Sequence, residues 1–276
     1  MKNLFLFTTL LLVSITFGQT KEKIKGSRIV TQSVIEIENF TSIELEDNFE
    51  IILSKADKPS LEIAADDNLH DVINTAIVNG NLKIASLKDV SRAKKFSVRI
   101  NYTDSLNFIL AKNETKISSL NTVELNNLTV KAYGKSEIVC KADVKNLNLI
   151  LDEKANAELS INAENTNIEI SQYANLEAII NNSETTKIDI YQKGKAEIEG
   201  KTNTLKLRLD NNANLTAKKF TAKEITLSAE GYSKISVFAD DNITISASGK
   251  SEIDLYGAPK IELPQFTNSA SLRKKE

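Results

Sequence analysis

The sequence LTVKAYGKSEI, at Leu128–Ile138, recurs with small changes as IDIYQKGKAEI at Ile188–Ile198, ITLSAEGYSKI at Ile225–Ile235 and ITISASGKSEI at Ile243–Ile253. Each copy has two aliphatic residues two positions apart, a turn residue, a small residue and two more apolar positions. Weaker copies begin at Leu106, Leu147, Ile168, Leu205 and Ile261, so successive starts lie 22, 19, 21, 20, 17, 20, 18 and 18 residues apart. A repeat of this length indicates a solenoid.

Within each copy, apolar and polar residues alternate, which is typical of strands with one buried face. Equivalent positions carry the same residue class from copy to copy, as stacked parallel coils require and a hairpin meander does not. We therefore predict an all-β fold: a right-handed parallel β-helix with an amino-terminal β-rich cap. The first predicted aliphatic ladder is Leu128, Leu147, Ile168, Ile188, Leu205, Ile225, Ile243, Ile261, and the second is Val130, Leu149, Ile170, Ile190, Leu207, Leu227, Ile245, Leu263.

The turns favour residues that accept a positive φ. Gly134, Gly194, Gly231, Gly249 and Asn211 occupy the turn position, while Glu153 and Ala174 there predict different turns or a local change of register. A small-residue corner is predicted from Ser136, Ala155, Leu176, Ala196, Ala213, Ser233 and Ser251. A further inward ladder is predicted from Cys140, Leu159, Ile180, Gly200, Ala217, Val237 and Leu255.

The amino-terminal part has a different pattern. Alternating strands are predicted in Phe40–Leu53 and Leu61–Ala65, and a hairpin at Asn79-Gly80. The predicted organisation is a signal peptide at 1–18, an extension at 19–39, a β cap at 40–105, β-helix repeats at 106–265 and a flexible tail at 266–276. Such a cap would protect the open end of the solenoid, which is otherwise a sheet edge.

These residues resemble a known family. The run FTSIEL at Phe40–Leu45, DDNL at Asp66–Leu69, VNGNLKI at Val78–Ile84, the repeated GKSEI and the closing LYGAPKI at Leu255–Ile261 are similar to the auto-transporter adhesin head GIN domain of Bacteroidetes envelope proteins. The resemblance covers Phe40 to Leu263. It implies an exported, right-handed β-helix-like protein with an adhesin label. This chain departs from the family pattern in having Asn, Ala and Glu at several turns.

Composition agrees with export. A positive start and the short apolar run Leu4–Phe17 predict a cleaved secretory signal, with Gln19 as the first mature residue. The single Cys140 excludes an internal disulfide. Acidic and basic residues are interspersed, which argues against nucleic-acid binding. We expect a location in the periplasm, on the outer membrane surface or outside the cell, without a membrane span after cleavage.

Few residues offer chemistry. His70 lies beside Asp66, Asp67 and Asp71, but the pattern lacks zinc-type spacing and favours a solvated histidine. Cys140 is interpreted as a buried structural thiol. A predicted outward ladder of Glu137, Asn156, Glu177, Glu197, Asn214, Lys234 and Glu252 stacks Glu177 on Glu197, with Lys135 and Lys195 expected to compensate their charge. Aromatic residues near turns are predicted at Tyr133, Tyr173, Tyr191, Tyr232 and Tyr256.

We therefore expect no catalytic, cofactor or metal residues, and the sequence does not identify a ligand-binding site. The preferred hypothesis is a non-enzymatic envelope or surface module that presents an elongated surface to an envelope, glycan or host surface ligand. One alternative is an extracytoplasmic carbohydrate-active β-helix enzyme, a lyase or hydrolase. Another is a self-assembling scaffold that uses the exposed strand at Ile261–Phe266, partly guarded by Pro264, and this leaves a homo-oligomer open.

Overall fold

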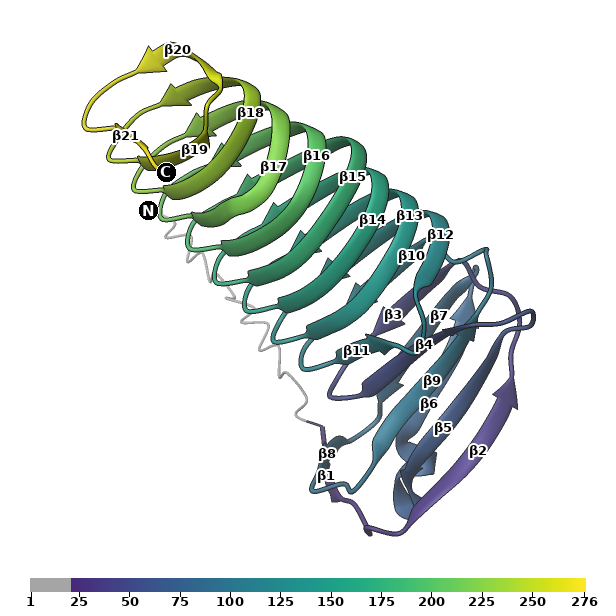
Figure 1. Ribbon diagram of the computed structural model, residues 1–276. Helices are drawn as coiled ribbons and strands as arrows, with labels where there is room; N and C mark the ends of the chain where they lie inside the picture. The colour runs from purple at the N-terminus through teal and green to yellow at the C-terminus, as the bar shows by residue number, and fades with distance from the viewer. Residues whose placement is uncertain (1–20) are drawn as a thin grey trace, which may run out of the picture.

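The computed structural model describes residues 21–276, which form a β-solenoid of about 9 turns with a β-rich cap at its amino-terminal end (Figure 1). The predicted fold class is confirmed. The predicted signal peptide at 1–18 lies outside the described residues.

In the central coils, one long strand runs along two arms of the coil with a bend between them, and a tight turn leads to the next coil. The solenoid strands are β10 (Phe108–Ala111), β11 (Lys116–Ser119), β12 (Val123–Ala132), β13 (Glu137–Leu151), β14 (Asn156–Ile170), β15 (Asn175–Ile190), β16 (Lys195–Leu209), β17 (Asn214–Ala229), β18 (Lys234–Ala247), β19 (Glu252–Gly257), β20 (Lys260–Phe266) and β21 (Ser271–Lys274). All pairings from β12 onward are parallel, so equivalent positions stack from coil to coil.

The cap contains β1 (Lys23–Lys25), β2 (Val30–Glu36), β3 (Ser42–Leu45), β4 (Glu50–Lys55), β5 (Ser60–Asp66), the 3₁₀ helix η1 (Asp67–Val72), β6 (Ile73–Val78), β7 (Asn81–Ser86), β8 (Asp89–Ser91) and β9 (Phe96–Tyr102). The predicted hairpin is β6–β7, and Asn79 and Gly80 both have positive φ, at 51° and 75°. Phe49 stacks on Phe96 with ring centroids 4.2 Å apart and closes the core at this end.

The cap continues both sheets of the solenoid. One sheet runs from β13 through β11, β4 and β9 in parallel pairings, and it ends with the antiparallel strands β5 and β2. The other runs from β12 through β10, β3 and β7 and ends with antiparallel β6. The change to antiparallel pairing ends the stack of coils, so the core does not open to water there.

The tight turns repeat one geometry in every coil. A residue with φ between 54° and 73° occupies the same place each time, namely Asn113, Gly134, Glu153, Gln172, Gln192, Asn211, Gly231, Gly249 and Asn268. Its carbonyl accepts a hydrogen bond from the turn of the next coil, as in Lys154 N to Gly134 O at 2.9 Å. The turn at Glu153 therefore is not different, and Gln172 and Gln192 hold the positions predicted for Ala174 and Gly194.

Two predicted ladders are wrong by two residues in the coils of β14 and β15. Ile168 and Ile188 stack on Leu149, in the second aliphatic ladder, and Thr166 and Thr186 occupy the first. With this register the coils from Leu128 to Ile261 are 19, 19, 20, 19, 20, 18 and 18 residues long. The apolar pattern missed the true starts because these two coils place polar threonines inside.

The same shift corrects three other ladders. Ala174 and Gly194, directly before β15 and β16, hold the corner positions predicted for Leu176 and Ala196. Cys140 stacks on Leu159, Ala178 and Ile198, not on Ile180 or Gly200. The outward ladder of Glu137 and Asn156 continues with Asn175 and Lys195, so Glu177 and Glu197 belong to the next outward row.

The carboxy-terminal residues form part of the last coil. Residues 266–276 were predicted as a flexible tail, but β21 pairs with β19 in parallel. Arg273 bonds Asp254 through Nε at 2.7 Å and Glu252 through Nη2 at 3.0 Å. The alternation in Ser271–Lys274 is too short to be recognised without this pairing.

Candidate functional site

A groove of about 1210 Å³ follows the bend of successive coils along the solenoid. Its residues come from triplets that occupy the same three positions in each coil, with a polar residue on either side of an inward residue. The triplets are Glu124-Leu125-Asn126, Asp143-Val144-Lys145, Asn162-Ala163-Glu164, Asn181-Asn182-Ser183 and Lys201-Thr202-Asn203, followed by Thr221 and Lys223.

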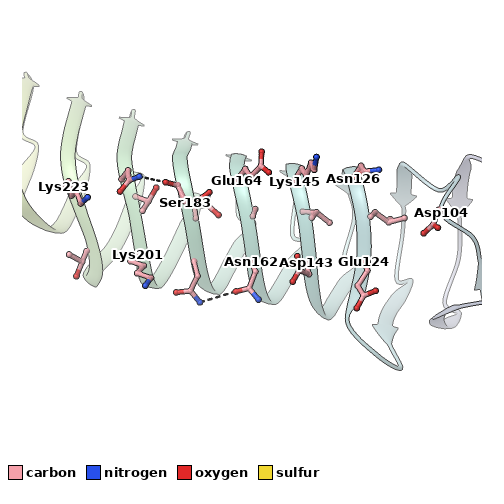
Figure 2. Close-up of a pocket in the computed structure, with 18 of the residues that line it drawn as sticks. Asp104, Glu124, Asn126, Asp143, Lys145, Asn162, Glu164, Ser183, Lys201 and Lys223 are labelled. Carbon is pink, nitrogen blue, oxygen red and sulfur yellow. Dashed lines mark hydrogen bonds between the residues drawn. The ribbon is translucent and has the colours of Figure 1, made fainter.

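The outer residues of the triplets form two parallel rows. Figure 2 shows Glu124, Asp143, Asn162 and Lys201 in one row, and Asn126, Lys145, Glu164, Ser183 and Lys223 in the other. Hydrogen bonds join neighbours within each row: Asn181 Nδ2 donates to Asn162 Oδ1 at 3.5 Å, and Asn203 Nδ2 donates to the Ser183 carbonyl. The rows are therefore walls that run along the axis and not isolated side chains.

The floor of the groove is closed by the inward residues. Leu125 and Val144 are 9% and 4% exposed, and Asn182 and Thr202 are each 5% exposed. Asn182 Nδ2 donates to Thr186 Oγ1 at 2.8 Å and to the Thr185 carbonyl at 3.2 Å, while Thr166 Oγ1 donates to Asn182 Oδ1 at 3.1 Å. Both the nitrogen and the oxygen of the buried Asn182 amide thus have hydrogen-bond partners. The amide fixes the bend at the place where β15 contains an extra residue relative to β14.

Charge is distributed unequally along the groove. Asp104, Glu124 and Asp143 lie near the cap, and Lys201 and Lys223 lie toward the carboxy-terminal coils (Figure 2). Lys55 Nζ lies 2.8 Å from Asp104 and 3.7 Å from Glu124, and the hydrogen bond that Lys55 donates to Asp104 raises the pKa of Lys55. Lys145 and Glu164 lie among the amides and hydroxyls of the middle coils, and Asp240 lies near the two lysines, so carboxylates are in slight excess near the cap and lysines are in slight excess at the other end.

A second hollow lies on the neighbouring arm of the coils. Glu158, Glu177 and Glu197 stack in register there, and the exposed apolar side chains of Leu120, Val139 and Ile179 border them. Among residues 21–276, no ion pair involves any of the three glutamates. The predicted compensation is wrong: Lys135 bonds Glu114 at 2.8 Å, and Lys195 stacks in the adjacent row.

The His70 and aspartate cluster is structural. Asp66 is buried and accepts hydrogen bonds from the backbone N–H groups of Arg28, Lys94 and Lys95 at 2.8 to 3.1 Å. Burial works against ionisation, but these backbone donors outweigh it and lower the pKa of Asp66. The two ring nitrogens of His70 contact Thr31 Oγ1 at 2.9 Å and Ser33 Oγ at 3.3 Å. Within the described chain, no group of three His, Cys, Asp or Glu side chains could hold a metal ion.

The remaining candidates are accounted for by packing and by turns. Burial raises the pKa of the Cys140 thiol to about 11, so the thiol is protonated at neutral pH and is a poor nucleophile. Tyr133, Tyr173, Tyr191 and Tyr232 lie at the tight turns, whereas Tyr256 lies in β19. Lys193 Nζ lies 4.9 Å from the ring centroid of Tyr173, and Lys250 Nζ lies 5.3 Å from that of Tyr232.

Sequence reasoning missed the groove, although a signal was present. The triplets recur with the same period as the strands, but their outer residues are acids in some coils and amides or lysines in others. A pattern based on residue class does not detect such a row. What stays constant from triplet to triplet is the position of the two polar residues, one on either side of an inward residue.

Comparison of the chain with models of known protein families finds a match to one family. The model described as "Putative auto-transporter adhesin, head GIN domain" matches residues 39–198 and 160–259. A comparison with curated proteins finds no match. Among residues 21–276, no helix has the length and apolar character needed to cross a membrane.

Solved structures share the fold at low identity. A putative adhesin from Parabacteroides merdae ATCC 43184 superposes with a TM-score of 0.69 at 18% identity, covering 92% of this chain and 100% of that one. A putative adhesin from Parabacteroides distasonis ATCC 8503 gives 0.55 at 20% identity with the same coverage of both chains. A putative lipid binding protein from the same organism gives 0.60 at 18% identity, again over 92% of this chain and 100% of that one.

Proposed function

Because the chain belongs to the putative auto-transporter adhesin, head GIN domain family, we propose that it is an exported, non-enzymatic surface or envelope protein whose groove binds a linear polysaccharide. The groove of the bend is the feature that supports this proposal. It crosses six coils, so it extends over roughly 24 Å at about 4.8 Å per coil.

The lining of the groove suits a polymer with hydroxyl groups along its length. Asn126, Asn162, Asn181 and Asn203 each carry an amide that both donates and accepts hydrogen bonds. Because the rows are in register, each coil offers the same pair of positions, and each sugar unit of an extended chain can meet an equivalent pair. A ligand held in this way gains affinity from several weak contacts in series rather than from one deep pocket.

The charged ends of the groove give the bound chain a direction. Lysines at one end favour a ligand with an acidic substituent there, and carboxylates at the other end disfavour it. An extended peptide is the other occupant that this shape admits. Along most of the groove, however, the backbone groups already pair with the adjacent coils, so a peptide cannot add to the sheet there.

One observation bears on the enzyme alternative. Glu124 and Asp143 lie opposite each other in register at the end of the groove near the cap. Glycoside hydrolysis usually requires two carboxylates that flank the bond, and two carboxylates on adjacent coils could supply such a pair. Glu124 lies 3.7 Å from Lys55 Nζ, so this carboxylate already has a partner on the protein. We therefore rank binding above turnover.

The experiment is a glycan and extracellular-matrix array screened with the mature chain, residues 19–276, in which soluble products are assayed from the same wells. Saturable binding to a linear glycan without product is the expected result. Release of shortened oligosaccharides that stops in Asp143→Asn would replace the binding proposal with the enzyme. Lack of both binding and product would contradict a glycan ligand and favour a structural role.

A further inference from the structure

Strand β2 is a free sheet edge at the outer side of the cap (Figure 1). It pairs with β5 along its whole length, and among the described residues no strand pairs with its other side. Six of its seven residues are exposed, and Ser33 is half-buried. Ile29 and Val34 are 62% and 70% exposed, so apolar side chains accompany the free edge.

The backbone geometry of β2 identifies which groups are unpaired. The Ile29 carbonyl accepts from Asp67 N at 2.8 Å, and Ile37 N donates to the Pro59 carbonyl at 3.5 Å, so the odd-numbered residues face β5. In an antiparallel pair, alternate residues direct their N–H and C=O groups to opposite sides. The backbone groups of Val30, Gln32, Val34 and Glu36 therefore point outward and form a template for another strand.

Edge strands in soluble proteins usually carry a feature that blocks such pairing. The sequence of β2, VTQSVIE, contains no proline and no lysine, and its register with β5 is regular. The last coil provides a contrast: its edge strand β20 contains Pro264 and pairs with β18 through a register shift. The free edge of β2 is therefore open in a way that β20 is not.

Contacts with neighbouring residues also fix the position of β2. Thr31 and Ser33 contact the two ring nitrogens of His70, and Asp66 accepts from Arg28 N at 2.8 Å just before the strand. A strand ordered in this way loses little conformational freedom when it pairs.

We propose that β2 pairs antiparallel with β2 of a second copy of this chain, about a two-fold axis at Gln32. In this register Val30 faces Val34, Ile29 faces Ile35 and Thr31 faces Ser33. Arg28, at the bend just before the strand, comes near Glu36 at both ends, and neither forms an ion pair within residues 21–276. Moving the axis to Ser33 would place Val30 opposite Glu36 and Val34 opposite Gln32. Each apolar residue would then face a polar one, so this register fits less well.

The pairing has a structural consequence. It joins the sheets that end in β9, β5 and β2 of both copies into one continuous sheet, and the two solenoids extend away from a common centre. One strand from each copy buries a small area, so the dimer depends on concentration. Two grooves carried by one dimer would bind a surface polymer more tightly than one groove. The pairing itself does not depend on what the groove binds.

The test is analytical ultracentrifugation of the full mature chain over a concentration series. A monomer–dimer equilibrium is expected. Gln32→Pro removes an outward N–H without touching the bonds to β5, and it should raise the dissociation constant at least about tenfold. Val34→Lys should act in the same direction. The matched control Val139→Lys changes an apolar residue that is 53% exposed on the solenoid, and it should leave the dimer intact.

A charge exchange tests the register. Arg28→Glu and Glu36→Arg should each weaken the dimer, and the double variant should restore it because the pair is reformed with reversed signs. Hydrogen exchange should show protection of the Gln32 and Val34 amides that increases with protein concentration. A chain that stays monomeric at all concentrations, or a dimer unaffected by Gln32→Pro, would overturn the proposal. Binding of an unrelated strand at β2 with no dimer would also overturn it.

Discussion

Thr166 Oγ1 donates a hydrogen bond to Asn182 Oδ1, 3.1 Å away in the next coil, inside the solenoid and beneath the groove. Thr166 and Asn182 are 2% and 5% exposed. The interior of these coils is therefore held partly by a polar network, at the place where the groove crosses the middle of the molecule.

The first prediction concerns this network. Asn182→Ala should lower the free energy of unfolding by about 1–3 kcal/mol, because Thr166 and Thr186 lose their buried partner. Asn181→Ala, on the adjacent exposed position, should change it by less than about 0.5 kcal/mol. Urea denaturation followed by circular dichroism gives both values. Equal effects of the two substitutions would contradict a structural role for the buried amide.

The second prediction concerns the distance between coils. Gly200 has a φ of 113°, and a Cβ there would lie 2.2 Å from the Ile180 carbonyl oxygen in the coil before. Gly200→Ala should therefore destabilise the chain by at least about 2 kcal/mol. Gly80→Ala is the matched control: its φ is 75°, but its Cβ would meet only Thr41 Oγ1 at 3.4 Å, so only the backbone strain remains. The thermal midpoint should fall more for Gly200→Ala.

The third prediction is a pH dependence of stability. The pKa of Asp66 is lowered in the folded chain, so the charged carboxylate stabilises the cap above the unfolded value of 3.8. That stabilisation should be lost as the pH falls below 3.8 and Asp66 becomes protonated in the folded state. Asp66→Asn should reduce the free energy of unfolding near neutral pH. It should also flatten the acid limb of the plot of that free energy against pH. Unfolding measured from pH 6 to about pH 2 tests this, and an unchanged acid limb would contradict it.

The fourth prediction concerns the stacked glutamates. Glu177 lies between Glu158 and Glu197, and like charges directly opposite on neighbouring strands destabilise a sheet. Glu177→Gln should stabilise the chain by about 0.2–1 kcal/mol at low salt, and the gain should shrink as salt screens the wild-type repulsion. Glu137→Gln is the control, because Glu137 is paired with Lys116 at 2.9 Å and its removal should not stabilise the chain.

The sequence predicts the solenoid well because stacked coils repeat their chemistry at every position. The aliphatic ladders follow from this repeat, and the β6–β7 hairpin follows from the turn preference of Asn79-Gly80. The register failed in the coils of β14 and β15, where Thr166 and Thr186 replace aliphatic residues. The unequal spacings of 21 and 17 residues were the visible trace of that error.

The turns and the groove could not be read from the sequence with the same ease. Glu153, Gln172 and Gln192 adopt positive φ because the coils above and below impose the turn, and local preference alone would not place them there. The groove depends on which positions face outward at the bend, and Lys145, Glu164 and Ser183 share a position but no chemistry. Such a surface is determined by register, which only the stacked structure supplies.

The most direct test of the binding proposal is a calorimetric titration of a linear glycan from the array with two charge-reversed variants of the same strand, β16. Lys201→Glu changes the wall of the groove, and Lys195→Glu changes an outward residue that lies outside it. We predict that Lys201→Glu weakens binding at least about tenfold while Lys195→Glu retains wild-type affinity. Equal affinity of both variants and the wild type would contradict the groove as the binding site.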